Sequence, residues 1–182
     1  MRAIAAALVH HPVLGRRGEI LTTTLTNLDL HDIARAVRVY GLAHLYIVHP
    51  LESQRYLAQR IVDHWMHGAG GRRIPDRAIA LEVVKLAATL DEACAAHGPD
   101  VELWTTSAIA CDPITSFADA RALLHTDGPA VMLCFGTGWG LAPEVHARAT
   151  LRLEPIRAHR DTGYNHLSVR SASAITFDRL LG

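Results

Sequence analysis

The sequence contains few cysteines, and none of them is spaced to bind a metal. Cys94, Cys111 and Cys134 are the three cysteines among 182 residues, and no two of them form a C-x-x-C pair. Unpaired thiols without metal-ligand spacing are typical of reduced cysteines, so we expect a cytoplasmic protein without a metal site. The apolar runs are also far too short to span a membrane, and we therefore expect no membrane partner.

The chain has no net charge, with 18 basic and 18 acidic side chains, but these charges are distributed unevenly. Residues 1–80 carry ten arginines and six acidic residues, a net charge of +4, and seven of the twelve histidines. Residues 81–182 carry eight basic and twelve acidic residues, a net charge of −4. A basic half beside an acidic half fits a polyanion bound on one face, although chance asymmetry explains it equally well.

Apolar runs alternate with segments of helical periodicity along the whole chain. We expect strands at 4–9, 42–48, 101–105, 130–135 and 150–153, with a further brief strand at 85–88. We expect helices at 28–40, 54–67, 77–84, 90–96, 117–125, 143–148 and 167–181. This alternation predicts an α/β fold with a mostly parallel sheet, in a single domain that covers residues 1–182. The glycine-rich residues 68–75 are interpreted as a flexible surface loop.

The first predicted helix illustrates the local signals. Leu30, Ile33, Ala34 and Val37 recur at i, i+3, i+4 and i+7, which is the spacing of one buried helix face. Asn27 precedes them and is a plausible N-cap.

Three predicted strands end in irregular loops, at 106–107, 136–140 and 156–165. The loop after the strand at 130–135 holds three glycines within five residues, which permits tight turns and close approach of the backbone to a ligand. Open parallel sheets bind ligands beyond the carboxyl ends of their strands. The sequence therefore predicts a pocket at one rim of the sheet, built mostly from backbone.

Three segments together resemble the SPOUT superfamily of RNA methyltransferases, and in particular its small stand-alone bacterial members that depend on S-adenosylmethionine (SAM). The segments are residues 26–35 (Thr-Asn-Leu-Asp-Leu-His-Asp-Ile-Ala-Arg), residues 135–141 (Phe-Gly-Thr-Gly-Trp-Gly-Leu) and residues 164–172. The resemblance implies a SPOUT-type parallel sheet with helices on both faces and a C-terminal trefoil knot, a rare exception among folds. It also implies SAM bound in the knot, S-adenosylhomocysteine as the product, a homodimer, and a tRNA or rRNA substrate.

The resemblance also indicates which residues form the SAM pocket. Glycines and apolar residues suit this ligand, because backbone N–H and C=O groups can hold its adenine and ribose. The glycine loop would line one wall, while Ile156 and Leu167 would cover the adenine. The predicted SAM-binding residues are Thr106, Phe135, Gly136, Thr137, Gly138, Gly140, Ile156 and Leu167.

Arg35 is the leading catalytic candidate. In many relatives that methylate the ribose 2′-oxygen, the arginine near the start of this helix contacts the RNA backbone and the attacking hydroxyl. The alternative is a solvated basic face on which Arg35 pairs with Asp32 one turn earlier.

Asn165 and Ser168 are the other catalytic candidates, and they depart from the family pattern. Ser168 stands where relatives carry the asparagine of a Ser-Leu-Asn run, and Asn165 lies three residues earlier. This leaves open whether a ribose or a base is methylated. Asp161 is an alternative general base, since base-methylating relatives use an aspartate in this loop. Glu144 either shapes the cofactor loop or caps the helix that it begins.

The basic residues after the first strand could contact phosphates, namely His10, His11, Arg16 and Arg17, although we interpret the two histidines as ordinary loop residues. Trp139 could stack on a base, or pack across a dimer interface. The chain shows no dedicated RNA-binding extension, so we expect the dimer surface or a partner to recognise RNA.

Two other functions compete with an RNA methyltransferase. A knotted RNA- or nucleotide-binding module without catalytic activity would explain the altered Ser-Leu-Asn run. A dehydrogenase is disfavoured, because no G-x-G-x-x-G follows the first predicted strand.

Overall fold

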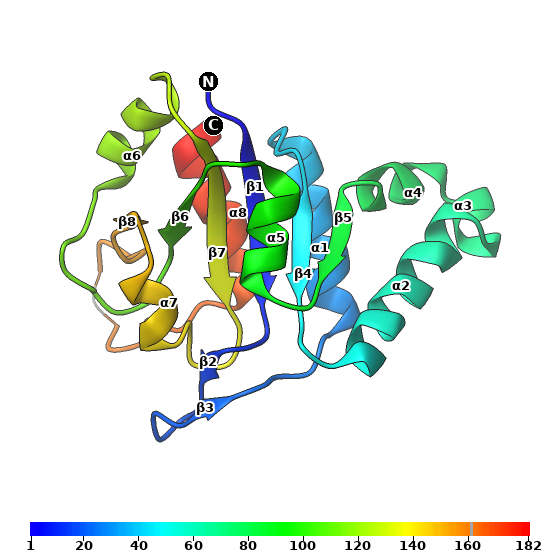
Figure 1. Cartoon of the computed structure of the whole chain (residues 1–182), viewed down its shortest axis with the longest axis horizontal. Coiled ribbons are helices and arrows are strands. Elements are labelled where there is room, and N and C mark those ends of the chain that lie inside the picture. The colour runs from blue at the N-terminus through cyan, green and yellow to red at the C-terminus, as the bar shows by residue number, and fades with distance from the viewer. Residues whose placement is uncertain (161) are drawn as a thin grey trace.

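A computed structural model of the chain describes residues 1–160 and 162–182 and shows one sheet with helices on both faces (Figure 1). Every neighbouring pair of strands in this six-stranded sheet is parallel. The expected α/β fold is thereby confirmed. The strands lie in the spatial order β5 (Val84–Ala87), β4 (Leu45–Val48), β1 (Ile4–Val9), β7 (Ala130–Gly136), β6 (Val101–Thr105) and β8 (Leu151–Arg152).

The helices form two layers. One face of the sheet carries α5 (Leu90–His97) and α7 (Pro143–Ala147), while the opposite face carries α1 (Asn27–Val39), α6 (Phe117–Leu124) and α8 (Val169–Leu181) (Figure 1). Beyond the β5 edge lie three further helices, α2 (Glu52–Met66), α3 (Ala69–Arg73) and α4 (Pro75–Leu81). None of the helices within residues 1–160 and 162–182 is long and apolar enough to cross a bilayer.

The central strand β1 shows why the sheet is buried on both faces. All six of its residues are buried. Ala6 and Leu8 pack into the core beneath α1 and α8, whereas Ala7 and Val9 pack into the core beneath α5 and α7. A strand covered on both faces carries a continuous apolar run, and this is the pattern of Ile4–Val9.

Helix α1 begins one residue earlier than the sequence indicated. Thr26, and not Asn27, is its N-cap, because the Thr26 hydroxyl accepts a hydrogen bond from the Asp29 amide at 3.1 Å. A threonine in extended conformation satisfies one of the free amides of the first turn as well as an asparagine does.

The interpretation of residues 68–75 as a flexible loop is wrong. Ala69–Arg73 form the short helix α3, which packs against α2. At Gly71 a side chain would collide with the Trp65 backbone, so glycine here allows two helices to approach closely.

A short antiparallel hairpin, which the sequence pattern did not indicate, lies beyond the carboxyl end of β1. Its strands are β2 (Val13–Leu14) and β3 (Ile20–Leu21), too short for a period-two pattern to show. The hairpin supports the glycine loop, since Leu14 accepts a hydrogen bond from the Trp139 amide and donates one to the Gly140 carbonyl, both at 2.9 Å.

Candidate functional site

A cavity of about 870 Å³ opens at the carboxyl ends of β6 and β7. Three loops far apart in the sequence form its walls: the glycine loop after β7, residues 106–111 after β6, and residues 165–169 before α8. Its size lies within the range typical of small-molecule sites. The predicted position of the pocket, at the carboxyl rim of a parallel sheet, agrees with the cavity.

All eight residues predicted to bind SAM line this cavity, as do Asn165 and Ser168. The Thr106 hydroxyl donates to the Cys134 carbonyl at 3.0 Å, so it is fixed against β7. Ile156 is half-buried and Leu167 is exposed at the rim. The eight residues predicted from the sequence therefore line one and the same cavity.

The predicted catalytic residues lie in different surroundings. Asn165 donates through Nδ2 to the Ala108 carbonyl at 3.1 Å, which ties the segment before α8 to the loop after β6. Ser168 is the N-cap of α8, and its hydroxyl accepts from the Ser171 amide at 3.2 Å. Arg35 is exposed on α1 and is not among the described residues that line the cavity.

Two acidic candidates take no visible part in the cavity. Glu144 is exposed in the first turn of α7 and is not among the described residues that line the cavity. Asp161 lies outside the described residues.

The glycine loop is shaped for close contact with a ligand. Gly138 adopts φ +60°, a left-handed conformation that side chains disfavour, and a Cβ there would lie 2.9 Å from the Leu14 carbonyl oxygen. The loop leads from a buried strand through this turn to Leu141, which is buried again. Such a turn presents backbone amide and carbonyl groups, rather than side chains, to the cavity.

Comparison with known proteins decides the family. A family model of SAM-dependent RNA methyltransferases matches residues 3–182. This chain belongs to the SAM-dependent RNA methyltransferase family. The match confirms the resemblance to RNA methyltransferases that depend on SAM.

Individual relatives agree with this family. A tRNA (guanine-N(1)-)-methyltransferase of Nitratidesulfovibrio vulgaris is 44% identical over 185 residues, a match that covers 100% of this chain and 42% of that protein. An uncharacterized protein of Aquifex aeolicus is 36% identical, with 96% of this chain and 86% of that protein covered. A solved structure of a probable methyltransferase from Bordetella pertussis superposes with a TM-score of 0.65 at 17% identity, covering 98% of this chain and 94% of that one.

This methyltransferase chain thus spans about 42% of the length of the tRNA methyltransferase that it matches. That relative is a longer protein, and its name refers to the whole of it, whereas the 182 residues of this chain match only part of its length.

The cavity of the methyltransferase fits SAM by its own chemistry. Gly136 and Gly138 allow the tight turn of the loop after β7, because a Cβ at either position would collide with backbone atoms of the loop or of Leu14. The Thr176 hydroxyl lines the cavity, is fully buried, and has no hydrogen-bond partner among the described residues. A buried hydroxyl without a partner is costly, so a ligand that supplies one would stabilise the site.

A buried hydrogen-bond chain stands behind the glycine loop. The Thr137 hydroxyl donates to the Val9 carbonyl at 3.2 Å and therefore accepts from the Thr23 hydroxyl, with which it makes a short contact. Thr23 in turn lies 3.0 Å from Nδ1 of His10. This order assigns the proton of neutral His10 to Nδ1. The chain couples β1 to the cavity wall at Thr137.

The expectation that His10 contacts phosphate is wrong, because the residue is completely buried and stacks on His49 with ring centroids 5.1 Å apart. Burial, reinforced by His49, lowers the pKa of His10 to about 4. His11, Arg16 and Arg17 are exposed, so their contact with phosphate stays a prediction.

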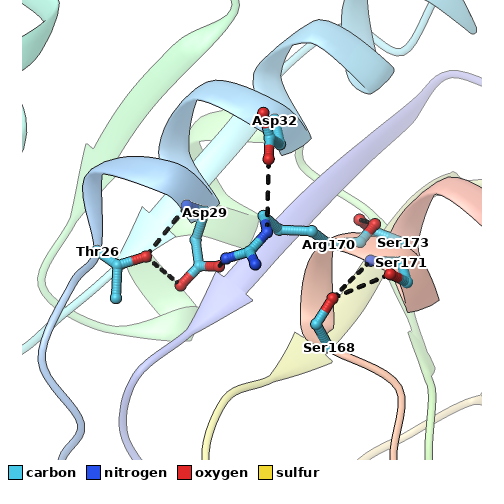
Figure 2. Close-up of polar contacts among 7 residues, drawn as sticks. All are labelled: Thr26, Asp29, Asp32, Ser168, Arg170, Ser171 and Ser173. Carbon is cyan, nitrogen blue, oxygen red and sulfur yellow. Dashed lines mark hydrogen bonds and ion pairs between the residues drawn. The ribbon is translucent and has the colours of Figure 1, made fainter.

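An ionic cluster joins α1 to α8 at the edge of the cavity (Figure 2). Arg170, in the first turn of α8, places Nη1 2.7 Å from Asp29 Oδ1 and Nε 3.4 Å from Asp32 Oδ2. Asp32 therefore pairs with Arg170, whereas the sequence suggested Arg35. Asp29 and Arg170 both lie in segments that the sequence singled out, but they are 141 positions apart, and no local pattern indicates their contact.

Sequence reasoning also missed His146. This residue of α7 lines the cavity, and its Nδ1 lies 3.0 Å from the Thr105 hydroxyl. Burial, and to a lesser degree the charge of Arg152, lowers the pKa of His146. Its spacing from other functional residues follows no recognisable motif. Within the described part of the chain, no group of three or more histidine, cysteine or acidic side chains converges to hold a metal.

Proposed function

We propose that this protein methylates a structured RNA, a tRNA or an rRNA, with SAM bound in the cavity at the carboxyl ends of β6 and β7 and S-adenosylhomocysteine released as product. The observation that supports this proposal is the convergence of three separate loops on one cavity whose lining is rich in glycine and backbone groups. Bound SAM supplies an electrophilic methyl group. The chain's own residues must align the attacking atom with that methyl group and remove its proton.

The proposed contacts to SAM follow from the walls of the cavity. Gly136–Gly140 would donate and accept through the backbone along one side of the nucleoside. Thr106 would approach from the loop after β6, with Ile156 and Leu167 across the adenine. Phe135 ends the buried part of β7 and would form the apolar floor.

RNA would approach over the basic and aromatic surface around the opening. Arg35 is exposed on α1, and we propose that it binds the RNA backbone, as His11, Arg16 and Arg17 would. We also propose that Asn165 and Ser168, on the cavity wall, contact the target nucleotide. Similarity to the tRNA methyltransferase from N. vulgaris favours tRNA as the substrate of this chain. It does not assign the modified atom, because the match covers only 42% of that protein.

The exposed aromatic side chains at the opening of the cavity support a target nucleotide whose base is unstacked from its neighbours in the RNA. Trp139 is 55% exposed and contacts His166 edge to face at 5.3 Å between ring centroids, and His166 contacts Tyr164 in the same way at 5.4 Å. Trp139 and His166 also line the cavity. Proteins that recognise single-stranded or extruded nucleotides stack the bases on such rings.

Replacing Trp139 with alanine is expected to raise the KM for RNA about 5- to 100-fold, because stacking contributes roughly 1–3 kcal/mol per base. The affinity for SAM, measured by isothermal titration, should stay within about twofold. If the Trp139→Ala variant is instead monomeric in gel filtration with light scattering, and its KM for RNA is unchanged, Trp139 belongs to the subunit interface.

Cys111 offers a readout of cofactor binding that needs no RNA. It is partly exposed and lines the cavity, whereas Cys134 is fully buried within β7. We expect iodoacetamide to alkylate Cys111 and not Cys134, and saturating S-adenosylhomocysteine to slow the Cys111 reaction at least about fivefold by filling the cavity. Mass spectrometry of tryptic peptides measures both sites, and equal rates with and without the ligand would contradict the proposed cavity.

We further propose that the chain is one domain, forms a homodimer, needs no metal and contains the trefoil knot of its superfamily. The knot is supported by two contacts that bind the C-terminal segment to the connection between β6 and α6. These are the bond from Asn165 to the Ala108 carbonyl and the parallel bridge between Thr115 and Leu153. An RNA substrate of this kind would place the protein in the cytoplasm.

The first experiment is isothermal titration of the purified protein with SAM, S-adenosylhomocysteine and NAD. Micromolar binding of the first two, and none of NAD, is expected. The second is transfer of tritiated methyl from SAM to total RNA of cells that lack the gene, with tRNA and rRNA separated afterwards. Binding without transfer to either RNA would contradict the proposed activity and favour a knotted binding module.

A further inference from the structure

Asp29 is a nearly buried carboxylate at the wall of the SAM cavity. Its residue is 7% exposed, and it lies among the residues that line the cavity together with Thr26 and Ser168. A carboxylate held away from water is costly unless hydrogen bonds and charge compensate for it. Asp29 has both kinds of support, and it lines the cavity proposed to bind SAM.

The contacts of Asp29 hold it in one orientation. Its Oδ2 accepts the Thr26 hydroxyl at 2.6 Å, and its Oδ1 accepts Nη1 of Arg170 at 2.7 Å (Figure 2). Each carboxylate oxygen has two lone pairs, so each retains the capacity to accept one more hydrogen. The side chain is therefore both fixed and able to accept a proton.

The charge of this cluster also suits a proton acceptor. Arg170 is shared between Asp29 and Asp32, so two carboxylates face one guanidinium. The cluster carries a formal charge of −1, and Asp29 is not fully neutralised by its partner. Asp32 is exposed and is absent from the described lining, so Asp29 is the member that reaches the cavity.

Several other polar groups of the wall are engaged in supporting the structure. Glu154 is the second carboxylate of the described lining, and its Oε1 accepts the Phe117 amide at 2.8 Å, at the start of α6. Ser168 caps α8, and Asn165 donates to a backbone carbonyl. His146 lies on α7, against Thr105, on the opposite face of the sheet from α1 and α8.

We propose that Asp29 is the general base of methyl transfer and that Arg170 is the positioning residue that orients it. This inference rests on the proposed RNA methyltransferase activity. As the attacking oxygen or nitrogen of the nucleotide forms its bond to the methyl carbon, its O–H or N–H bond breaks and the proton moves to Asp29. The bond between sulfur and methyl breaks at the same time, and its electron pair remains on the sulfur.

The test compares Asp29→Asn with the matched control Asp32→Asn, which removes the other carboxylate bound to the same arginine. Asp29→Asn is expected to lower kcat by roughly 100-fold or more, since general bases contribute about 10²- to 10⁴-fold. Asp32→Asn should lower kcat by less than about tenfold, because Asp32 acts on Asp29 only through the Arg170 that they share. SAM affinity by titration and the melting temperature should be similar in both variants.

A charge-exchange variant separates catalysis from simple bracing of α1 against α8. The double substitution Asp29→Arg with Arg170→Asp keeps an ion pair between the helices and removes the carboxylate from its position on α1. We expect this variant to fold, as judged by circular dichroism, and to remain inactive. It also tests the proposal if Asp29→Asn does not fold.

Two results would overturn the inference: Asp29→Asn with more than half of the wild-type kcat, or recovery of activity in the charge-exchange variant. Each of these two results can be interpreted only if the wild-type protein methylates RNA in the same assay. A wild-type protein that binds no SAM and transfers no methyl group would contradict the proposed function itself, which keeps the two failures distinct.

Discussion

Replacing Gly136 with alanine is expected to weaken SAM binding about 10- to 100-fold. Gly136 ends β7, and a Cβ there would lie 2.4 Å from the Leu141 nitrogen and 2.7 Å from the Gly140 carbonyl carbon. Both are backbone atoms of the loop's return, so no flexible side chain can move aside. Forcing extra atoms into a packed site costs roughly 1–3 kcal/mol, and about 1.4 kcal/mol corresponds to a tenfold change in affinity.

Gly98→Ala is the matched control for this experiment. Gly98 follows α5, has extended backbone, and a Cβ there would meet only Val101 Cγ2 at 3.8 Å, an ordinary contact. Its affinity for SAM in isothermal titration should equal that of the wild type within about twofold. Normal affinity in a folded Gly136→Ala protein would show that the loop after β7 does not form the SAM site.

The stability of the protein should fall as the pH is lowered from about 6.5 to 4, and His10 should account for about 3 kcal/mol of that fall. Burial is the main cause that lowers the pKa of His10 from its ordinary value of 6.5 to about 4. The unfolded chain therefore takes up a proton that the native protein excludes. The stabilisation is fully present above pH 6.5 and is lost as the pH approaches 4.

His10→Gln removes the titrating group and keeps a side-chain donor for Thr23. Urea unfolding at pH 7 and at pH 4.5 should show a smaller loss of unfolding free energy in this variant than in the wild type. The other histidines with a lowered pKa are present in both proteins and cancel in the comparison. Thr23→Val serves as the control, because it breaks the hydrogen bond but leaves His10 buried, and it should retain the wild-type pH dependence. Parallel pH profiles of wild type and His10→Gln would contradict the assignment.

The glycine-rich wall of the cavity could be predicted because its signals are local. The residues at 136–140 follow a buried strand and contain the glycines that a tight turn requires, and both features can be seen in the eleven consecutive residues 130–140. The rule that parallel strands present their loops at one rim then places 106–107 and 156–165 nearby. The knot, the dimer and the identity of SAM came from resemblance to a family and not from periodicity.

Where predictions failed, the environment of a residue depended on distant parts of the chain. His10 follows a strand and was expected at the surface, but its amide donates to the Val48 carbonyl of β4, its carbonyl accepts from the Thr23 amide, and the residue is completely buried. The segment at 68–75 has the composition of a flexible loop, yet its glycines allow α3 to pack on α2. For His10, composition indicated exposure and packing determined burial. For 68–75, composition indicated a loop, and packing against α2 gave a helix in which Gly70 alone is buried.

Hydrophobic periodicity and turn chemistry in the chain were therefore sufficient for the α/β class, the elements of the sheet and the glycine wall of the site. Each depends on neighbours within a few residues, over which side-chain direction follows regular geometry. The ionic cluster of Asp29, Asp32 and Arg170 was decided by tertiary structure alone. It exists because α8 packs beside α1 on the same face of the sheet, and only that packing brings a guanidinium to a carboxylate 141 residues away.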